Sequence, residues 1–155
     1  MVYGIYSGMD NETTLAIFKM KHIAKKNYAP VSGLGALAQA LAENDVVYVV
    51  NVNRFLSIAQ MFSFAQFCHE RGVVLHFIEQ PYLDISTSKK WKPSIVRLIQ
   101  KMANGENDAK AYMRRCFRMT DVQWGYVDTC LEKMNLASLA AVFSSDGVLG
   151  RNRQS

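Results

Sequence analysis

Three apolar runs in the first half of the chain predict buried strands. They cover residues 2–6, 45–52 and 73–78, and each is rich in β-branched or aromatic side chains. Strands that alternate with helices are typical of an α/β fold with a mainly parallel sheet. Apolar residues spaced three and four apart predict the helices of this alternation over residues 12–26, 34–43 and 56–71, the last of them ending at Gly72.

Polar residues follow two of the predicted strands. Ser7 comes directly after the first strand, and Asn53 and Arg54 come after the second. Open parallel sheets bind ligands at the carboxyl ends of their strands, so we expect these side chains at the functional edge of the sheet. The alternatives are that Ser7 is a turn residue and that Arg54 forms a surface ion pair.

The second half of the chain has the pattern of amphipathic helices. Residues 93–103 place Ile95 and Ile99 on one side and Arg97 on the other, and Asn104-Gly105 predicts the end of this helix. A glycine in a helix interior costs only about 1 kcal/mol, so one longer helix is the alternative. Three short helices after a basic region are typical of a helix-turn-helix unit. Beyond a basic helix over 108–118, we expect these three helices to run from a cap at Thr120 or Asp121 to Lys133, from a cap at Asn135 to Phe143, and over 147–153.

Charge is unevenly distributed along the 155 residues. The chain has 18 Lys+Arg and 13 Asp+Glu, a net charge of +5. Six basic and seven acidic residues precede Lys89, whereas twelve basic and six acidic residues lie from Lys89 onward. A basic C-terminal half predicts a polyanion partner such as nucleic acid, or an anionic membrane surface. A solvated basic surface without a partner is the alternative.

Cysteines and apolar runs bear on the compartment. The three cysteines, Cys68, Cys116 and Cys130, have no second Cys or His at metal-ligand spacing, so we expect reduced and mostly buried thiols. No stretch has the pattern of a signal peptide, and no apolar run reaches the roughly 18 residues that cross a bilayer. We therefore expect a cytoplasmic protein that does not insert into a membrane.

Six segments occur in an order that is found in one protein family. VYGIYS at 2–7 looks like a first strand leading to a nucleophilic serine, and DVVYVVNVNRFLS at 45–57 looks like an apolar strand followed by an Asp-Arg-Leu-x-Arg-Ser signature. VSG at 31–33, FCHERGV at 67–73, DIST at 84–87 and LEKMNLASLAAVFS at 131–144 complete the series. Taken in order, they resemble the serine recombinases, the resolvase and DNA invertase family, over most of the chain.

This resemblance implies a site-specific recombinase of mobile elements that breaks and rejoins DNA through a phosphoserine intermediate. It implies a resolvase-like three-layer catalytic domain over 1–103 and a helix-turn-helix DNA-binding domain over 104–155. Ser7 occupies the position of the nucleophile, and Arg54 that of the first arginine of the signature. Arginines would stabilise the phosphorane charge, so no metal and no cofactor is implied. DNA is the implied partner, and the protein is expected to form a dimer or tetramer.

Three residues depart from the family pattern. Ile5, Asn53 and Ser57 stand where the family has an arginine, the signature aspartate and the second signature arginine, and residues 34–41 lack the expected basic residue. Loss of a single electrostatic donor typically costs roughly a hundredfold or more in rate. These departures argue against an active strand-transfer enzyme. The alternative is a catalytically inactive regulatory protein that binds DNA or a recombinase.

Two groups of C-terminal residues are candidates for contact with DNA. The arginines of the helix over 108–118 precede the expected helix-turn-helix, so we expect them to contact the phosphate backbone, with a solvated helix face as the alternative. The residue types at 151–153 suit the edges of guanine and adenine. The first group is Arg114, Arg115 and Arg118, and the second is Arg151, Asn152 and Arg153.

Overall fold

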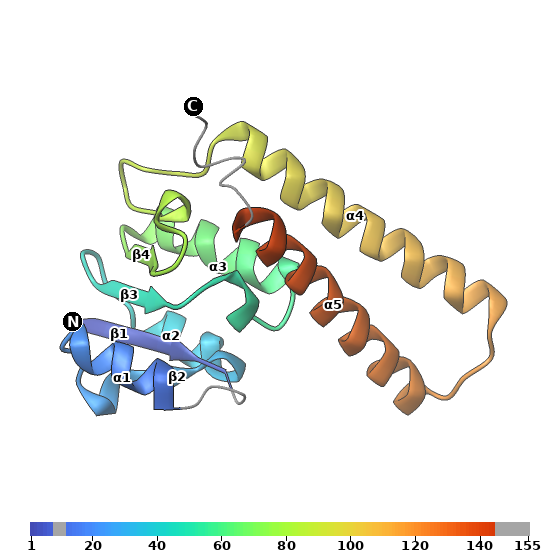
Figure 1. The fold of residues 1–155 in the computed structure, drawn as a ribbon, viewed down its shortest axis with the longest axis horizontal. Coiled ribbons are helices and arrows are strands. Elements are labelled where there is room, and N and C mark those ends of the chain that lie inside the picture. The colour runs from blue at the N-terminus through green and yellow to red at the C-terminus, as the bar shows by residue number, and fades with distance from the viewer. Residues whose placement is uncertain (8–11, 145–155) are drawn as a thin grey trace.

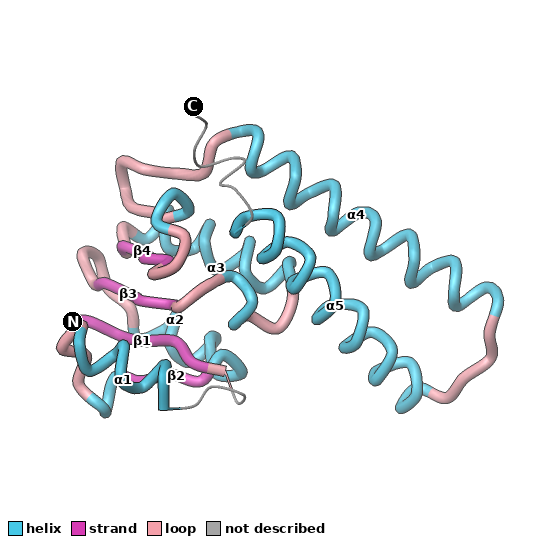
Figure 2. The backbone as a smooth tube through the Cα atoms, in the orientation of Figure 1, coloured by secondary structure: helices cyan, strands magenta, loops and turns pink. Residues whose placement is uncertain are grey.

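The computed structural model describes residues 1–7 and 12–144 of the chain. Within them, four parallel strands form one sheet in the order β2-β1-β3-β4 (Figure 2). The strands are β1 (Val2–Tyr6), β2 (Tyr28–Pro30), β3 (Val46–Val49) and β4 (Val74–Phe77). The predicted α/β class with a mainly parallel sheet is therefore confirmed. Only β2 was not predicted, because three residues are too short to form a recognisable apolar run.

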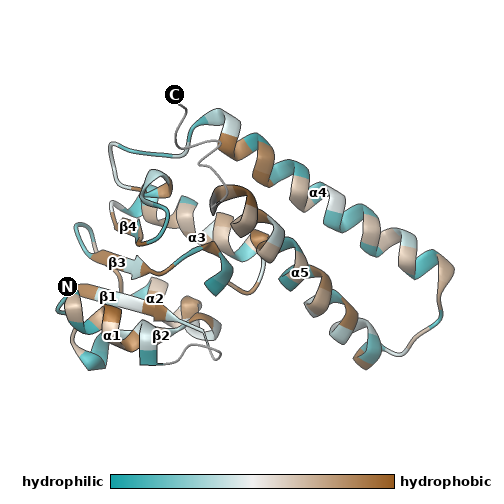
Figure 3. Cartoon of the chain, viewed as in Figure 1, coloured by the Kyte–Doolittle hydropathy of each residue, from teal (hydrophilic) through white to brown (hydrophobic). Residues whose placement is uncertain are grey.

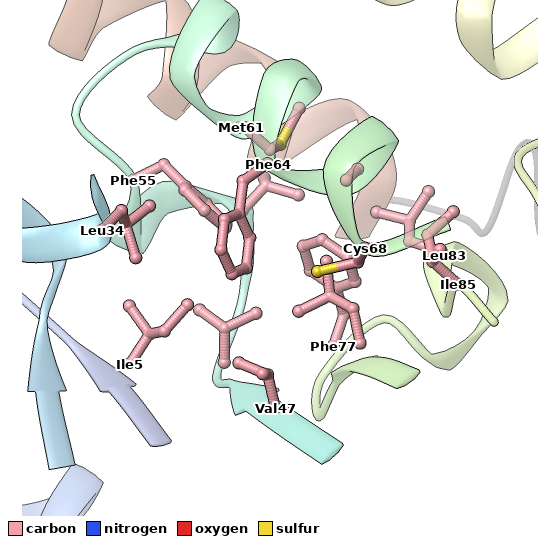
Figure 4. Packing of buried hydrophobic residues seen from close by; sticks show 14 of the residues in the cluster. Ile5, Leu34, Val47, Phe55, Met61, Phe64, Cys68, Phe77, Leu83 and Ile85 are labelled. Atoms are coloured by element: carbon pink, nitrogen blue, oxygen red, sulfur yellow. The ribbon is translucent and has the colours of Figure 1, made fainter. Parts of the chain in front are cut away.

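Helices cover both faces of the sheet and make three layers (Figure 1). On one face, α1 (Glu12–Met20) packs so closely that a Cβ atom on Gly4 would lie 2.7 Å from the ring of Phe18. On the other face lie α2 (Leu34–Ala40) and α3 (Ile58–Arg71). Figure 4 shows side chains of α3 directed at those of β1 and β3, and this contact forms the main apolar core.

The ends of the early helices follow local backbone chemistry. The helix predicted over 12–26 ends at Met20, because His22 has a φ of 60° and the Ile23 N–H donates to the Phe18 carbonyl. The end of α3 is as predicted: Gly72 has a φ of 78°, a left-handed conformation that glycine adopts without steric cost.

The last third of the described chain is a hairpin of two long helices, α4 (Pro93–Cys116) and α5 (Asp121–Ser144). The predicted helix end at Asn104-Gly105 was wrong: α4 continues through it, with open space around Gly105. The predicted start at Asn135 was also wrong, because its side chain donates to Oε1 of Glu106 at 2.8 Å instead of capping a helix. Residues 121–144 thus form one helix rather than the first two helices of a helix-turn-helix, and the predicted boundary between 103 and 104 falls inside α4.

One half of the hairpin is anchored in the core. Leu136, Leu139 and Phe143 of α5 are 0–2 % exposed and belong to the same apolar cluster as the sheet. The Tyr82 hydroxyl donates to the Phe143 carbonyl at 2.5 Å. We call residues 93–104 and 133–143 the root half of the hairpin and residues 105–132 its outer half. Figure 1 shows the outer half extending away from the sheet.

The cysteines are free, as predicted, but they differ in environment. Cys68 is buried on α3, and burial raises the pKa of its thiol to about 12. Cys116 and Cys130 are exposed, so the expectation of mostly buried thiols was wrong for these two. Among the described helices, none combines the length and the apolar character that crossing a membrane requires.

Candidate functional site at the carboxyl edge of the sheet

The strand order creates a switch point between β1 and β3. From β1 the chain moves to β2 on one side, and from β2 it crosses back to β3 on the other side. β1 and β3 are hydrogen-bonded neighbours, with Ile5 opposite Val49, so their carboxyl ends lie side by side. Open α/β sheets bind ligands in the crevice at such a point, because the two crossover connections diverge there.

Ser7 and Arg54 both lie at this edge. Ser7 directly follows β1 and is 7 % exposed. Arg54 is the last residue of a short 3₁₀ turn, η3 (Val52–Arg54), which follows β3. Its side chain is half-buried, and its Nε atom is shielded from solvent. The structure therefore brings the two predicted catalytic positions to the ends of adjacent strands.

Amide side chains hold η3 in place. Oδ1 of Asn51 accepts from the Asn53 N–H at 2.9 Å, and its Nδ2 donates to Oε1 of Glu79 at 2.8 Å. Oε1 of Gln80 accepts from the buried Val52 N–H at 3.1 Å. Glu79 and Gln80 follow β4, so the ends of β3 and β4 are tied together here. The resulting turn fixes the backbone from which Arg54 projects.

The far side of η3 is covered by α5. The ammonium group of Lys133 donates to the Phe55 carbonyl at 3.3 Å, directly after η3. Neither Gln80 nor Lys133 was predicted from the sequence as a site residue. The strand-end rule that selects Ser7 would have selected Gln80 after β4, whereas Lys133 reaches the site only through the packing of α5.

The positions that depart from the recombinase pattern have structural roles. Ile5 is 0 % exposed in the core, and Ser57 is the N-cap of α3, where its hydroxyl accepts from the Gln60 N–H at 3.0 Å. Asn53 is half-buried, and its N–H is held by Asn51. None of these side chains can supply the positive charge that a phosphorane needs.

Asp84, which begins the DIST segment, organises the turn after β4. Its Oδ1 accepts from the Phe77 N–H at 2.8 Å, and its Oδ2 lies 2.7 Å from Nδ1 of His76. Ile85 then forms an antiparallel bridge with Leu75 beside β4. This segment therefore returns the chain along the edge of the sheet toward α4.

The predicted DNA-contacting arginines have different surroundings. Nη2 of Arg114 lies 2.6 Å from Oδ2 of Asp128 on α5, and its guanidinium group stacks 4.8 Å from the Trp124 ring centroid. Arg115 and Arg118 are exposed. Arg151, Asn152 and Arg153 lie outside the described residues, and DNA contact by all six residues stays a prediction.

A second cluster of charged side chains joins α4 and α5, and it lies closer to the sheet than the Arg114–Asp128 pair. Nζ of Lys110 lies 2.8 Å from Oε2 of Glu132 and 3.3 Å from Oε2 of Glu106. Burial by itself would lower the pKa of Lys110, but the two carboxylates outweigh it and raise the pKa above its ordinary value. The cationic helix face predicted over 108–118 is thus partly neutralised within the chain.

No group of three or more His, Cys, Asp or Glu side chains is arranged to hold a metal ion within the part of the chain that the structure describes. No family model matches the chain, and no curated protein matches its sequence.

Proposed function

We propose that the protein is a DNA-binding member of the serine recombinase type, acting as a dimer or tetramer, with weak strand-cleaving activity. The observation that carries this proposal is the placement of Ser7 and Arg54 at the ends of β1 and β3, on either side of the switch point. The ordered sequence resemblance assigns these two positions to the nucleophile and to a phosphate-binding arginine. The geometry agrees with such a pairing, because both residues follow adjacent parallel strands.

The chemistry would proceed by direct displacement at phosphorus. The Ser7 oxygen forms a bond to the phosphorus of a DNA phosphodiester, the bond from phosphorus to one deoxyribose oxygen breaks, and the serine proton ends on that oxygen. The guanidinium group of Arg54 would offset the charge on the phosphate oxygens. Attack by the freed deoxyribose hydroxyl on the same phosphorus would break its bond to the Ser7 oxygen, return the proton to the serine and rejoin the strand.

A second candidate function is a catalytically silent regulator that binds DNA or a recombinase. Two observations favour it. Ile5 and Ser57 are committed to the core and to a helix cap, so the cations expected at those positions are missing. In addition, α5 lies against η3 through Lys133, next to Arg54.

A covalent-complex assay distinguishes the two functions. The protein is incubated with supercoiled DNA that carries its native flanking sequence, then denatured, and DNA-linked protein is quantified. We expect a low yield of complex from the wild type, none from Ser7→Ala, and an unchanged yield from Ser63→Ala, which removes an exposed hydroxyl on α3. If neither the wild type nor either variant forms a complex, but Ser7→Ala still binds DNA, strand cleavage is rejected and the regulatory function is supported.

A further inference from the structure

The excess positive charge of the chain is confined to one short segment. Residues 1–88 have six basic and seven acidic side chains, and residues 102–155 have seven and six. Residues 89–101 have five basic side chains and no acidic one. The charge of this segment, +5, therefore equals the net charge of the whole chain. Its basic residues are Lys89, Lys90, Lys92, Arg97 and Lys101, which we call the 89–101 surface.

All five side chains of the 89–101 surface are exposed. Within residues 1–7 and 12–144, none of them forms an ion pair, and the ammonium group of Lys89 donates to the Pro81 carbonyl at 3.4 Å. The sequence contains no carboxylate between Asp84 and Glu106 that could neutralise them. Lys110 and Arg114 differ in this respect, because both are paired with acidic residues of α5.

The three lysines lie on a segment that is fixed in place. Trp91 is 6 % exposed, its Nε1 donates to the Leu83 carbonyl at 2.6 Å, and its ring lies 6.0 Å from that of Phe62. The Ser86 N–H donates to the Lys89 carbonyl at 2.8 Å. A ligand that binds here would not have to order the backbone, so the loss of backbone entropy on binding is small.

The two cations on α4 are oriented by the core. Ile95 and Ile99 are 2 % and 1 % exposed, and Arg97 and Lys101 each follow one of them by two residues. A step of two residues turns a helix by about 200°, so both cations lie on the face opposite the core. Residues four apart on a helix are about 5–6 Å from each other, which allows both side chains to reach neighbouring phosphates of one strand.

The surface suits nucleic acid better than a membrane. Peripheral membrane binding combines cations with apolar side chains that enter the bilayer. The exposed large apolar side chains of the described chain lie elsewhere, for example Tyr112, Phe117, Val122 and Tyr126 at the outer end of the hairpin. Between residues 86 and 101 every exposed side chain is polar, charged or proline.

We propose that the 89–101 surface is the main contact of this protein with the phosphate backbone of duplex DNA. The proposal rests on the proposed function, since it takes DNA as the partner, and it adds the surface that binds it. Five phosphate contacts would give a plot of log affinity against log salt concentration with a slope of about −4.5. The proposal also ranks the cations of α4: Arg97 and Lys101 in the root half should contribute more to DNA affinity than Arg115 and Arg118.

Two double variants with the same change in charge test this ranking. Arg97→Gln/Lys101→Gln removes two cations from the 89–101 surface, and Arg115→Gln/Arg118→Gln removes two exposed cations from the other end of α4. Affinity for a fluorescent 30-base-pair duplex is measured by anisotropy at several salt concentrations. We expect the first variant to lose about tenfold or more in affinity at 0.1 M salt and about 2 units of the salt slope. The second variant should lose less than about threefold, because its cations are not the main phosphate contacts.

Each outcome has a separate meaning. Equal losses in the two variants, or a larger loss in Arg115→Gln/Arg118→Gln, would overturn the proposed surface while leaving DNA binding intact. No binding of the wild type at low salt would reject the proposed function itself. In a parallel arm with vesicles containing phosphatidylserine, binding that depends on Arg97 and Lys101 while DNA affinity does not would assign the surface to a membrane and overturn the proposal.

Discussion

The two halves of the α4–α5 hairpin are built differently, although the same helices run through both. In the root half, Ile95, Ile99 and Leu139 are 0–2 % exposed and are part of the core beneath the sheet. In the outer half, the helices are joined by charged groups, with Lys110 2.8 Å from Glu132 and Arg114 2.6 Å from Asp128. Figure 3 shows hydrophilic and hydrophobic residues alternating along α4. Apolar burial thus holds the root half, and ion pairs contribute to holding the outer half.

This difference determines what a cation on α4 can do. The carboxylates of Asp128 and Glu132 on α5 face the outer part of α4. They pair with Arg114 and Lys110, so these two charges are offset within the chain. Arg97 and Lys101 have no such partner among the described residues, so no carboxylate there offsets their charge. The availability of a cation for an external phosphate therefore depends on what the antiparallel helix presents to it.

The largest expected effect comes from truncating leucines in the two halves of α5. Leu139 is 0 % exposed, so we expect Leu139→Ala to lower the free energy of unfolding by about 2–5 kcal/mol. Leu131 in the outer half is only half-buried, so Leu131→Ala should cost about 1 kcal/mol or less. Urea denaturation followed by tryptophan fluorescence measures both losses. Equal losses would mean that the halves are packed alike.

A smaller effect of opposite sign is expected where the two halves of α4 meet. Gly105 is exposed, and a Cβ atom there would meet nothing within 4 Å. We expect Gly105→Ala to raise the free energy of unfolding by about 0.5–1 kcal/mol, because alanine loses less backbone entropy in a helix. As a control, Gly4→Ala should lower stability, since its Cβ would lie 2.7 Å from the Phe18 ring. Destabilisation by Gly105→Ala would show that α4 is interrupted there.

The smallest expected effect is the coupling across the outer half. Arg114 and Asp128 are 2.6 Å apart, with 43 % and 27 % of their side chains exposed. A double-mutant cycle of Arg114→Ala and Asp128→Asn, measured by denaturation, should give a coupling energy of about 0.5 kcal/mol that shrinks in 1 M salt. A coupling that is absent at low salt, or that does not change with salt, would contradict the ionic account of this half.

The strands of the core were predictable because their signal is local. Runs of β-branched residues at 45–52 and 73–78 contain β3 and β4, and Gly72 marks the end of α3 by its own conformational freedom. The starts of both hairpin helices, at Pro93 and Asp121, were also predicted, but the interruptions predicted inside them were wrong, and the contact that decides at Asn135 is distant in sequence. From the sequence alone Asn135 is a candidate N-cap, whereas in the structure its side chain donates to Glu106, 29 residues away.

The residues of the candidate site also fall into those that local sequence identifies and those that it does not. Ser7 and Arg54 could be identified from their positions after apolar strands, since strand order brings carboxyl ends to one edge. The contact of Lys133 with the Phe55 carbonyl depends on α5 folding back over η3, which no periodicity in the sequence specifies. The same return of α5 decides that Arg114 is paired and Arg97 is not.

The anchoring of α5 gives the hairpin the properties of a lever. Each of its helices has 24 residues and is therefore about 36 Å long. The pivot lies near Leu136, the outermost buried residue of α5, and the loop that joins the helices is at the far end of the hairpin. The part of α5 beyond Leu136 is about 22 Å long, so a rotation of about 10° at the pivot would carry that loop through about 4 Å. A small rearrangement where α5 touches η3, beside Arg54, would thus be amplified into a displacement of the far end of the molecule.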